Sequence, residues 1–293
     1  MSYNSGKKGP KVVISGYYGF DNCGDEAVLL SIVHCLRTLR PDVRITVLSN
    51  NPQKTAALYA VDAVNRWNPL SVALQLLSCR LVISGGGSLL QDVTSSKSLR
   101  YYLSVIKIAK LFRKKVMIYS QGIGPLNAGK NRVRVSRSLN RCHTITVRDE
   151  RSLDLLKEIG ITHDIQVVCD PVIALSPEDV DCAEAEDHLR GLIASDDMSK
   201  DRKPLLMAAV RQWGDGRHIA PVAEFLDKQI KGGWDVLLVS AHYPSDLEAA
   251  NDIKHFMTEQ PYLLDKCLTA KEFMSLTACA DRVFSMKIGR AHV

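Results

Sequence analysis

The chain has 293 residues with 46% hydrophobic content, enough to bury a core in each of two domains, which excludes a largely disordered protein. The net charge is +6, with basic residues gathered at 110–115 and 130–141; this favours an anionic ligand or an anionic membrane face, with solvated helix faces as an equal alternative. No motif indicates nucleic acid, and no apolar run or leader indicates membrane insertion or secretion, so we expect a soluble, cytoplasmic protein.

The amino-terminal region predicts a strand, a loop and a helix. Lys11–Ser15 is typical of a short buried parallel strand, and apolar residues at 28–36 form the stripe of an amphipathic helix. Between them lies Gly16–Ala27, a glycine-rich loop that ends in acidic residues. Ligands of parallel sheets bind outside the carboxyl ends of the strands, so we expect this loop to meet a ligand. Its glycine spacing differs from the dinucleotide fingerprint, which makes NAD the least favoured ligand.

Strands and helices alternate along the rest of the chain, which predicts parallel sheets with crossover helices. In the first half we expect strands at 44–49, 81–84, 116–120 and 144–147, and helices at 69–77, at 99–112, up to Asn140, and from 148–152 to a C-cap at Gly160. In the second half we expect strands at 205–210, 236–240 and 283–285, and helices at 219–231 and 246–257. Between the halves, an acidic stretch to Asp197 indicates a connection with a surface helix. We therefore predict an α/β fold of two Rossmann-like domains, 1–175 and 176–293, facing across a cleft.

The eight cysteines and eight histidines show no metal-binding pattern. No two cysteines form a C-x-x-C pair, and the histidines do not alternate with them at ligand spacing. We therefore expect free buried thiols and no metal site.

Loops that follow the strands of the first domain should meet at one edge of its sheet. Gly85, Gly86 and Gly87 follow the strand at 81–84. They either let backbone amides approach a substrate anion or simply allow the chain to form a tight turn. The sequence leaves both interpretations open.

Polar side chains also stand at these strand ends. Gln121, held by Gly122, can hydrogen-bond a sugar hydroxyl, with an ordinary loop as the equal alternative. Arg148 follows an apolar strand and precedes a helix, where its planar guanidinium can bind phosphate or carboxylate. The structural alternative for Arg148 is a salt bridge to Asp149 or Glu150.

The acidic end of the first loop has two interpretations as well. Asp25 and Glu26 can position an acceptor hydroxyl or act as a base, and acidic residues at a helix start also simply complement the helix dipole. Gly24 precedes them and is assigned to substrate binding.

The second domain offers equivalent positions. Arg211 follows the strand at 205–210 and, with Trp213, can close the cleft from its other side. His242 follows the strand at 236–240, and a single histidine in such a place is more often structural or on the surface than catalytic. Arg211 and His242 are therefore assigned to substrate binding.

Five segments form an ordered set: GYYGFDNCGDEA at 16–27, ISGGGSLLQD at 83–92, YSQGIGP at 119–125, VRDERS at 147–152, and the Asp170-Pro171 step. This set resembles the polysaccharide pyruvyl transferase family, and most closely its CsaB-type members, which pyruvylate secondary cell wall polysaccharide.

The resemblance implies a GT-B-like arrangement of two Rossmann-like domains, phosphoenolpyruvate as donor, no cofactor, and a lipid-linked saccharide containing N-acetylmannosamine as acceptor. The implied product is a 4,6-ketal. Protonation of the enol carbon makes its neighbour electrophilic, one sugar hydroxyl adds, and loss of phosphate lets the second hydroxyl close the ring. Arg148 matches the family position expected to hold the donor. A lipid-linked acceptor also implies peripheral contact with the inner membrane face.

The carboxyl-terminal residues depart from this resemblance. Family members continue as Arg-Leu-His-Ala after a strand such as 283–286 and carry a functional His and a Lys further on, whereas this chain reads KIGRAHV. We interpret 288–293 as non-native residues read from a sequencing adapter and Lys287 as a hybrid codon, so His292 is not taken for the functional histidine. We expect such a truncated second domain to be inactive and poorly stable.

Two other functions stay open from the residues. One is a GT-B glycosyltransferase that uses a nucleotide sugar, and the other is a non-catalytic glycan-binding protein. A pyruvyl transferase releases phosphate from phosphoenolpyruvate, whereas a glycosyltransferase releases a nucleotide from its sugar donor. A non-catalytic protein would bind glycan with unchanged affinity after Arg148→Ala, whereas a pyruvyl transferase would lose donor binding.

Overall fold

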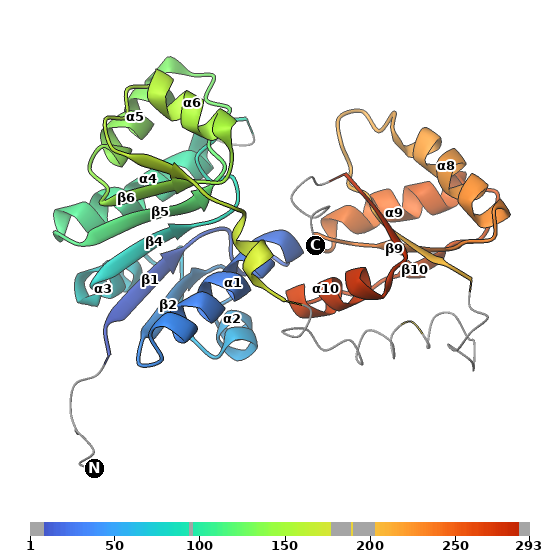
Figure 1. The fold of residues 1–293 in the computed structure, drawn as a ribbon, viewed down its shortest axis with the longest axis horizontal. Coiled ribbons are helices and arrows are strands. Elements are labelled where there is room, and N and C mark those ends of the chain that lie inside the picture. The colour runs from blue at the N-terminus through green and yellow to red at the C-terminus, as the bar shows by residue number, and fades with distance from the viewer. Residues whose placement is uncertain (1–8, 94–95, 177–188, 190–202, 287–293) are drawn as a thin grey trace, which may run out of the picture. The chain divides into compact units, whose positions relative to one another are not determined.

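The computed structural model describes residues 9–93, 96–176, 189 and 203–286. The chain divides into two compact units (Figure 1). Met1–Phe20 and Val28–Ala174 form the first unit, and Asp21–Ala27 and Leu175–Val293 form the second. Apart from Leu189, the acidic surface helix expected up to Asp197 lies outside the described residues, and so do residues 287–293, so the predictions about both stay predictions.

The first unit contains a parallel sheet of seven strands in the order β3-β2-β1-β4-β5-β6-β7. Its strands are β1 (Lys11–Ser15), β2 (Arg44–Ser49), β3 (Asp62–Asn65), β4 (Leu81–Gly85), β5 (Lys115–Gln121), β6 (Thr144–Val147) and β7 (Ile165–Val167). Its helices are α1 (Cys23–Leu39), α2 (Pro52–Tyr59), α3 (Pro69–Ser78), α4 (Ser96–Leu111), α5 (Gly129–Leu139), α6 (Glu150–Glu158) and the 3-10 helix η1 (Pro171–Ala174). Because β1 lies between β2 and β4, the order of the strands reverses there, which is where open α/β sheets bind ligands.

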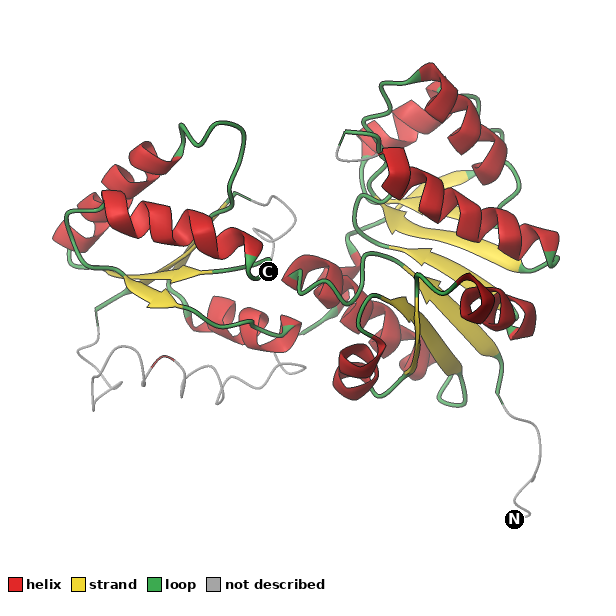
Figure 2. Ribbon diagram, turned by 180° about the vertical axis from the view of Figure 1, so that it is seen from behind, coloured by secondary structure: helices red, strands yellow, loops and turns green. Residues whose placement is uncertain are grey.

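Helices cover both faces of this sheet (Figures 1 and 2). The inner strands β1, β2, β4, β5 and β6 are mostly buried on both sides, and successive residues point to opposite faces. Val13 joins the core formed with α3, α4, α5 and α6, whereas Val12 and Ile14 join the core formed with α1 and α2. The near-continuous apolar runs that predicted parallel strands are therefore a consequence of this two-sided burial.

The second unit contains a parallel sheet in the order β10-β9-β8-β11. Its elements are β8 (Leu205–Ala209), α8 (Ile219–Lys231), β9 (Asp235–Val239), α9 (Ser245–Phe256), β10 (Tyr262–Leu264), α10 (Ala270–Cys279) and β11 (Arg282–Ser285). Helices α8 and α9 pack on one face and α10 on the other, as Figure 2 shows. The prediction of an α/β fold with two parallel, Rossmann-like sheets is confirmed.

Several elements lie where the sequence predicts none. Helix α2 begins at Pro52 and is capped by Asn51, whose side chain accepts from the amide of Lys54. The short strands β3, β7 and β10 and the helix α10 were also missed. Gly160, by contrast, follows α6 with φ of +81°, as its predicted role as a C-cap requires.

Candidate functional site

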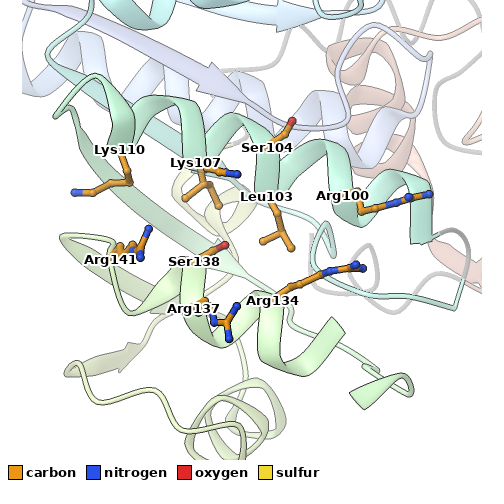
Figure 3. A pocket seen from close by; sticks show the side chains of 10 residues that line it. Arg100, Leu103, Ser104, Lys107, Lys110, Arg134, Arg137, Ser138 and Arg141 are labelled. Atoms are coloured by element: carbon orange, nitrogen blue, oxygen red, sulfur yellow. The ribbon is translucent and has the colours of Figure 1, made fainter. Parts of the chain in front are cut away.

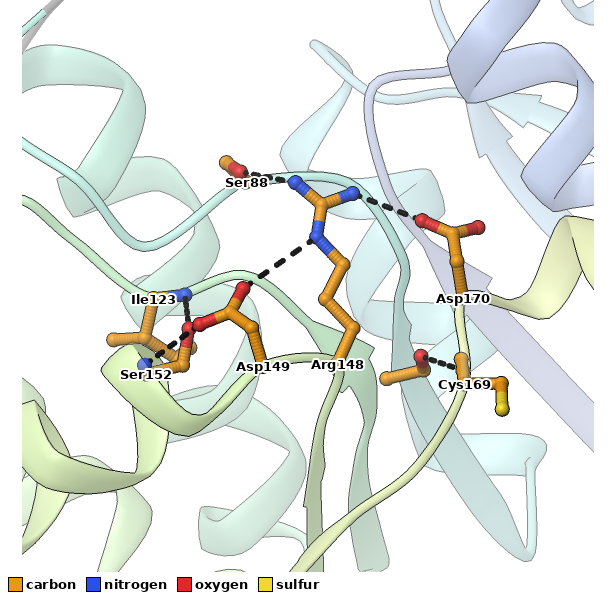
Figure 4. Close-up of polar contacts among 8 residues, drawn as sticks. Ser88, Ile123, Arg148, Asp149, Ser152, Cys169 and Asp170 are labelled. Carbon is orange, nitrogen blue, oxygen red and sulfur yellow. Dashed lines mark hydrogen bonds and ion pairs between the residues drawn. The ribbon is translucent and has the colours of Figure 1, made fainter. Parts of the chain in front are cut away.

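Arg148 lies directly after β6, at the carboxyl edge of the first sheet (Figure 4). Its Nη1 donates to Oδ2 of Asp170 at 3.0 Å, and its Nη2 donates to Oγ of Ser88 at 3.1 Å. Oδ2 of Asp149 lies 3.9 Å from Nε, so the ion pair that the sequence raised as an alternative is present. A guanidinium has five N–H donors, and hydrogen bonds to described residues use two of them. The side chain is 28% exposed and therefore keeps donors for an anionic ligand.

The loop after β5 packs closely around this arginine. A Cβ added at Gly122 would lie 3.0 Å from both Nε and Nη2 of Arg148 and 2.8 Å from Oγ of Ser88. Gln121 is fully buried, and its Nε2 donates to the carbonyl of Ser84 at 2.9 Å and to its Oγ at 2.8 Å. In this position Gln121 does not face solvent and supports the loop from within.

Gly85 ends β4, and Gly86 and Gly87 follow it in positions set by packing and backbone conformation. A Cβ added at Gly86 would lie 1.9 Å from Cγ1 of Val28 in α1, and Gly86 and Gly87 have φ of +54° and +66°. The amide of Gly86 donates to the carbonyl of Tyr119 at 3.0 Å. This amide is therefore not available to an anion, which favours the interpretation as a tight turn at Gly86 and Gly87.

Asp92 ties the loop after β4 to the loop after β5. Its carboxylate accepts from the amides of Asn127 and Ala128 at 2.9 and 3.0 Å and from Nδ2 of Asn131 at 2.9 Å. These hydrogen bonds, that of the Asn127 amide first, hold the pKa of Asp92 below its usual value. Asp92 thus fixes the position of the loop that follows Gln121.

The glycine-rich loop Gly16–Ala27 is divided between the two units. Asp21–Ala27, which includes the start of α1, belongs to the second unit. The amide of Cys23 donates to the carbonyl of Ala241 at 2.9 Å, and Asn22 forms an antiparallel bridge with His242. The sequence placed this segment in the first domain; its backbone pairing with the end of β9 is the physical reason for the difference.

This pairing places Asp25 and Glu26 in the same unit as His242. Gly24 donates its amide to Oδ1 of Asn22 at 3.3 Å, and Asp25 and Glu26 occupy the first turn of α1. Glu26 is only 8% exposed, whereas Asp25 is half-buried. The segment that carries the two carboxylates is therefore held beside His242 by the backbone.

Arg211 stands at the point where the strand order of the second sheet reverses, because β8 neighbours both β9 and β11. Its guanidinium lies 5.2 Å from the ring of Trp213, which is 63% exposed. Nε of Arg211 is buried and has no hydrogen-bond partner among the described groups. The carbonyl of Arg211 contacts Nε2 of His218 at 2.9 Å.

The predicted residues thus form two groups, one in each unit. The first unit holds Gly85, Gly86, Gly87, Gln121, Gly122 and Arg148, and the second holds Gly24, Asp25, Glu26, Arg211 and His242.

Sequence reasoning missed three side chains at the edge of the first sheet. Ser88 and Asp170 hold Arg148, and both lie in motifs that we quoted without assigning them a role. Arg66 follows β3, is 4% exposed and donates from Nη1 to the carbonyl of Gly16 at 2.8 Å. Its guanidinium carbon lies 4.2 Å from the ring centroid of Tyr101. The sequence gave no signal for Arg66, because β3, the strand that it follows, is short and has no apolar run.

The described residues offer neither a cluster of metal ligands nor a membrane-spanning helix. They contain no group of three or more His, Cys, Asp or Glu that could hold a metal ion. In the same part of the chain no helix has the length and apolar character needed to cross a bilayer. Cys23, Cys79 and Cys142 are buried, but Cys169 is exposed, so the expectation of uniformly buried thiols is wrong.

Comparison with known proteins gives one family. A family model described as polysaccharide pyruvyl transferase matches residues 22–288. The search of curated proteins found no match.

Solved structures show the fold. UDP-GlcNAc 2-epimerase from Methanocaldococcus jannaschii has a TM-score of 0.64 at 10% identity, over 94% of this chain and 78% of that one. UDP-GlcNAc 2-epimerase from Neisseria meningitidis bound to UDP-GlcNAc has a TM-score of 0.59 at 12% identity, over 95% and 78%. Anabaena HepE in complex with UDP and glucose has a TM-score of 0.50 at 13% identity, over 96% and 70%. At these identities the likeness describes a GT-B-like α/β fold and nothing further.

Proposed function

The chain belongs to the polysaccharide pyruvyl transferase family, and from this premise we propose that it moves a pyruvyl group from phosphoenolpyruvate to a cell-wall saccharide. The acceptor is a lipid-linked saccharide that contains N-acetylmannosamine, the product is a 4,6-ketal, and the reaction takes place at the cytoplasmic face of the membrane. The family match over residues 22–288 is the observation that carries this proposal. Phosphoenolpyruvate is a substrate here, and no cofactor is required.

Arg148 is the residue that we assign to the donor. Phosphoenolpyruvate carries a phosphate and a carboxylate, and both suit a planar guanidinium that is fixed on one side and open on the other. Asp170 and Ser88 fix its Nη1 and Nη2, and the partial exposure of the side chain leaves the remaining N–H groups to the ligand.

The second unit supplies groups of the kind that the acid and base steps need. Ketal formation requires a proton on the methylene carbon of the donor and removal of a proton from each attacking hydroxyl. We assign these transfers to Asp25 and Glu26, and we assign His242, which the pairing with Asn22 holds in the same unit, to substrate binding. Arg211 provides a second cation for the donor or for the leaving phosphate.

Donor binding tests the assignment of Arg148 without requiring turnover. Titration of the chain with phosphoenolpyruvate should show binding that Arg148→Ala weakens by about 1.5–3 kcal/mol, roughly tenfold to a hundredfold, the order expected for hydrogen bonds to a charged group. Arg151→Ala is the matched control, because Arg151 is exposed on α6 three residues further along. Equal affinities of wild type and Arg148→Ala would refute the assignment.

The transfer itself is tested with both substrates present. We expect phosphate release and a pyruvylated saccharide when phosphoenolpyruvate and the lipid-linked acceptor are supplied together. Release of nucleotide from a nucleotide sugar would instead identify a glycosyltransferase. Glycan binding that is unchanged in Arg148→Ala, with neither release reaction, would identify a non-catalytic binding protein.

A further inference from the structure

A basic pocket lies between α4 and α5 in the first unit (Figure 3). Its volume is about 410 Å³, and its floor includes the buried side chains of Leu103 and Ile106. In Figure 3, Lys110 and Arg141 lie towards one end of the pocket. None of the residues assigned to the transfer reaction lines it.

The charge of this pocket is of one sign. Six basic side chains line it, from Arg100, Lys107, Lys110, Arg134, Arg137 and Arg141, and none of the lining residues is acidic. Within the described part of the chain, Lys107, Arg137 and Arg141 make no side-chain hydrogen bond or ion pair. Like charges so close together repel each other, and an anionic partner would relieve this repulsion.

Exposed apolar side chains flank the pocket on both helices. Leu111 is 76% exposed and lies four residues after Lys107, so the two share one stripe of α4. Val133 is 52% exposed and lies four residues before Arg137, on the corresponding stripe of α5. The surface therefore combines cations with aliphatic side chains that no described part of the chain covers.

The combination of basic and exposed aliphatic side chains favours a lipid bilayer over a soluble phosphate or a nucleic acid as the anionic partner. A soluble phosphate or a nucleic acid would be bound by the cations alone and would leave Leu111 and Val133 in water, and base stacking would call for aromatic residues. At a bilayer, lipid phosphates contact the basic side chains while the aliphatic ones enter the headgroup region. We propose that the surface formed by α4 and α5 docks the protein on a membrane that contains anionic phospholipid. The inference rests on the proposed function in one respect: the membrane is where a lipid-linked acceptor is found.

Vesicle binding tests the proposal independently of catalysis. The full chain is sedimented with vesicles of phosphatidylcholine alone or with phosphatidylglycerol added. We expect binding only to the anionic vesicles, with an affinity that falls as salt is raised. Lys107→Glu combined with Arg137→Glu should lower the partition coefficient at least tenfold. Lys254→Glu combined with Lys271→Glu makes the same change of net charge on exposed residues of the second unit and should have little effect.

A second variant separates a membrane from a soluble polyanion. Leu111→Ser should weaken binding to anionic vesicles severalfold while leaving retention on a phosphate-bearing resin unchanged. Circular dichroism confirms that each variant is folded. Equal binding to neutral and anionic vesicles, no effect of Lys107→Glu with Arg137→Glu, or full displacement by inorganic phosphate would each overturn the proposal. Because no turnover is measured, vesicle binding can succeed where pyruvyl transfer fails, and the reverse.

Discussion

Arg148 illustrates how a few neighbours decide what a strong functional group can do. Asp149 accepts the amide of Ser152 at 2.7 Å and thereby caps α6, so its carboxylate is held in place beside the guanidinium. Asp170 is held similarly, by the amide of Val172 at 3.2 Å. The two carboxylates compete with an anionic ligand for the cation, but they also fix the direction of its free N–H groups. The residues around Arg148 therefore fix the orientation of its guanidinium.

Gly122→Ala tests this orientation. The added Cβ would lie 3.0 Å from Nε and Nη2 of Arg148, so the guanidinium must move. We expect donor affinity to fall about tenfold, the order of one charged hydrogen bond, with the free energy of unfolding changed by less than ~1 kcal/mol. Titration with phosphoenolpyruvate and urea denaturation measure the two quantities.

The control is Gly129→Ala at the start of α5. A Cβ added there meets nothing within 4 Å, so binding should stay unchanged and stability should rise slightly, by about 0.5–1 kcal/mol. If Gly122→Ala bound the donor as wild type does, the close packing around Arg148 would not matter for the ligand.

At the scale of elements, α10 shows how one residue can start a helix and tie it to a loop. The Thr269 side chain accepts from the amide of Glu272 at 3.1 Å, and Glu272 accepts from the amide of Thr269 at 2.6 Å, which completes a capping box. Nζ of Lys266 also donates to Glu272 at 2.7 Å. Burial pushes the pKa of Glu272 up, but the hydrogen bonds from Lys266 and Thr269 outweigh it and leave the pKa below its usual value of 4.5.

A pH dependence of stability follows. A depressed acid pKa means that the unfolded chain binds the proton more tightly than the folded one, so this stabilisation is complete above about pH 4.5 and is lost as the pH falls further. Glu272→Gln should lower the free energy of unfolding at pH 7 by about 1–2 kcal/mol and flatten its decline below pH 5. Urea denaturation between pH 7 and pH 3.5 measures both effects.

Glu248→Gln serves as the comparison, because Glu248 is an exposed acid in the first turn of α9. It should leave the pH profile close to that of wild type. A profile for Glu272→Gln that is as steep as the wild-type one would show that other carboxylates govern the acid limb.

At the scale of the whole molecule, the two units do not correspond to two continuous stretches of chain. Cys23 is 4% exposed and packs in the core of the second unit with Leu205, Met207 and Phe273. Its Sγ lies 3.5 Å from the carbonyl of Leu268. A segment from the amino-terminal part of the chain thus contributes to the stability of the carboxyl-terminal sheet.

Cys23→Ser should therefore destabilise the second unit. A hydroxyl among apolar side chains costs about 1–2 kcal/mol even when it keeps one hydrogen bond. Of the three tryptophans, Trp67 lies in the first unit, so in a Trp67→Phe background the fluorescence reports on Trp213 and Trp234 in the second. We expect the urea midpoint of this signal to fall.

Cys35→Ser is the matched control, because Cys35 lies in the same helix but within the first unit and is only half-buried. It should shift the signal of the second unit little. If both variants lowered that signal equally, the units would unfold together and the special role of Cys23 would be refuted.

The sequence alone determined the elements whose signals are local. Thr144–Val147 and Ile219–Lys231 have the bounds that we predicted, because each is an apolar run or an amphipathic stripe set off from its flanking loops. Helix α10 was missed because its polar residues Glu272, Ser275 and Thr277 are buried together with the apolar ones, so polar and apolar residues do not separate into an exposed and a buried face. Strand β3 was also missed, because it is short, begins and ends with a polar residue, and contains no apolar run. Arg66, which follows this strand, was missed for the same reason.

The sequence also determined the family, through an ordered set of loops at strand ends. It showed the basic stretch at 130–141, and it made Arg148 the candidate for donor binding, which stays a prediction. The tertiary structure decided which groups hold Arg148, that Gln121 is buried, that Asp21–Ala27 pairs with the strand end at Ala241, and that α4 and α5 form one basic surface. The physical reason is that helix and strand periodicity are set by neighbouring residues, whereas these four results depend on packing between segments far apart in the chain, which local spacing does not encode.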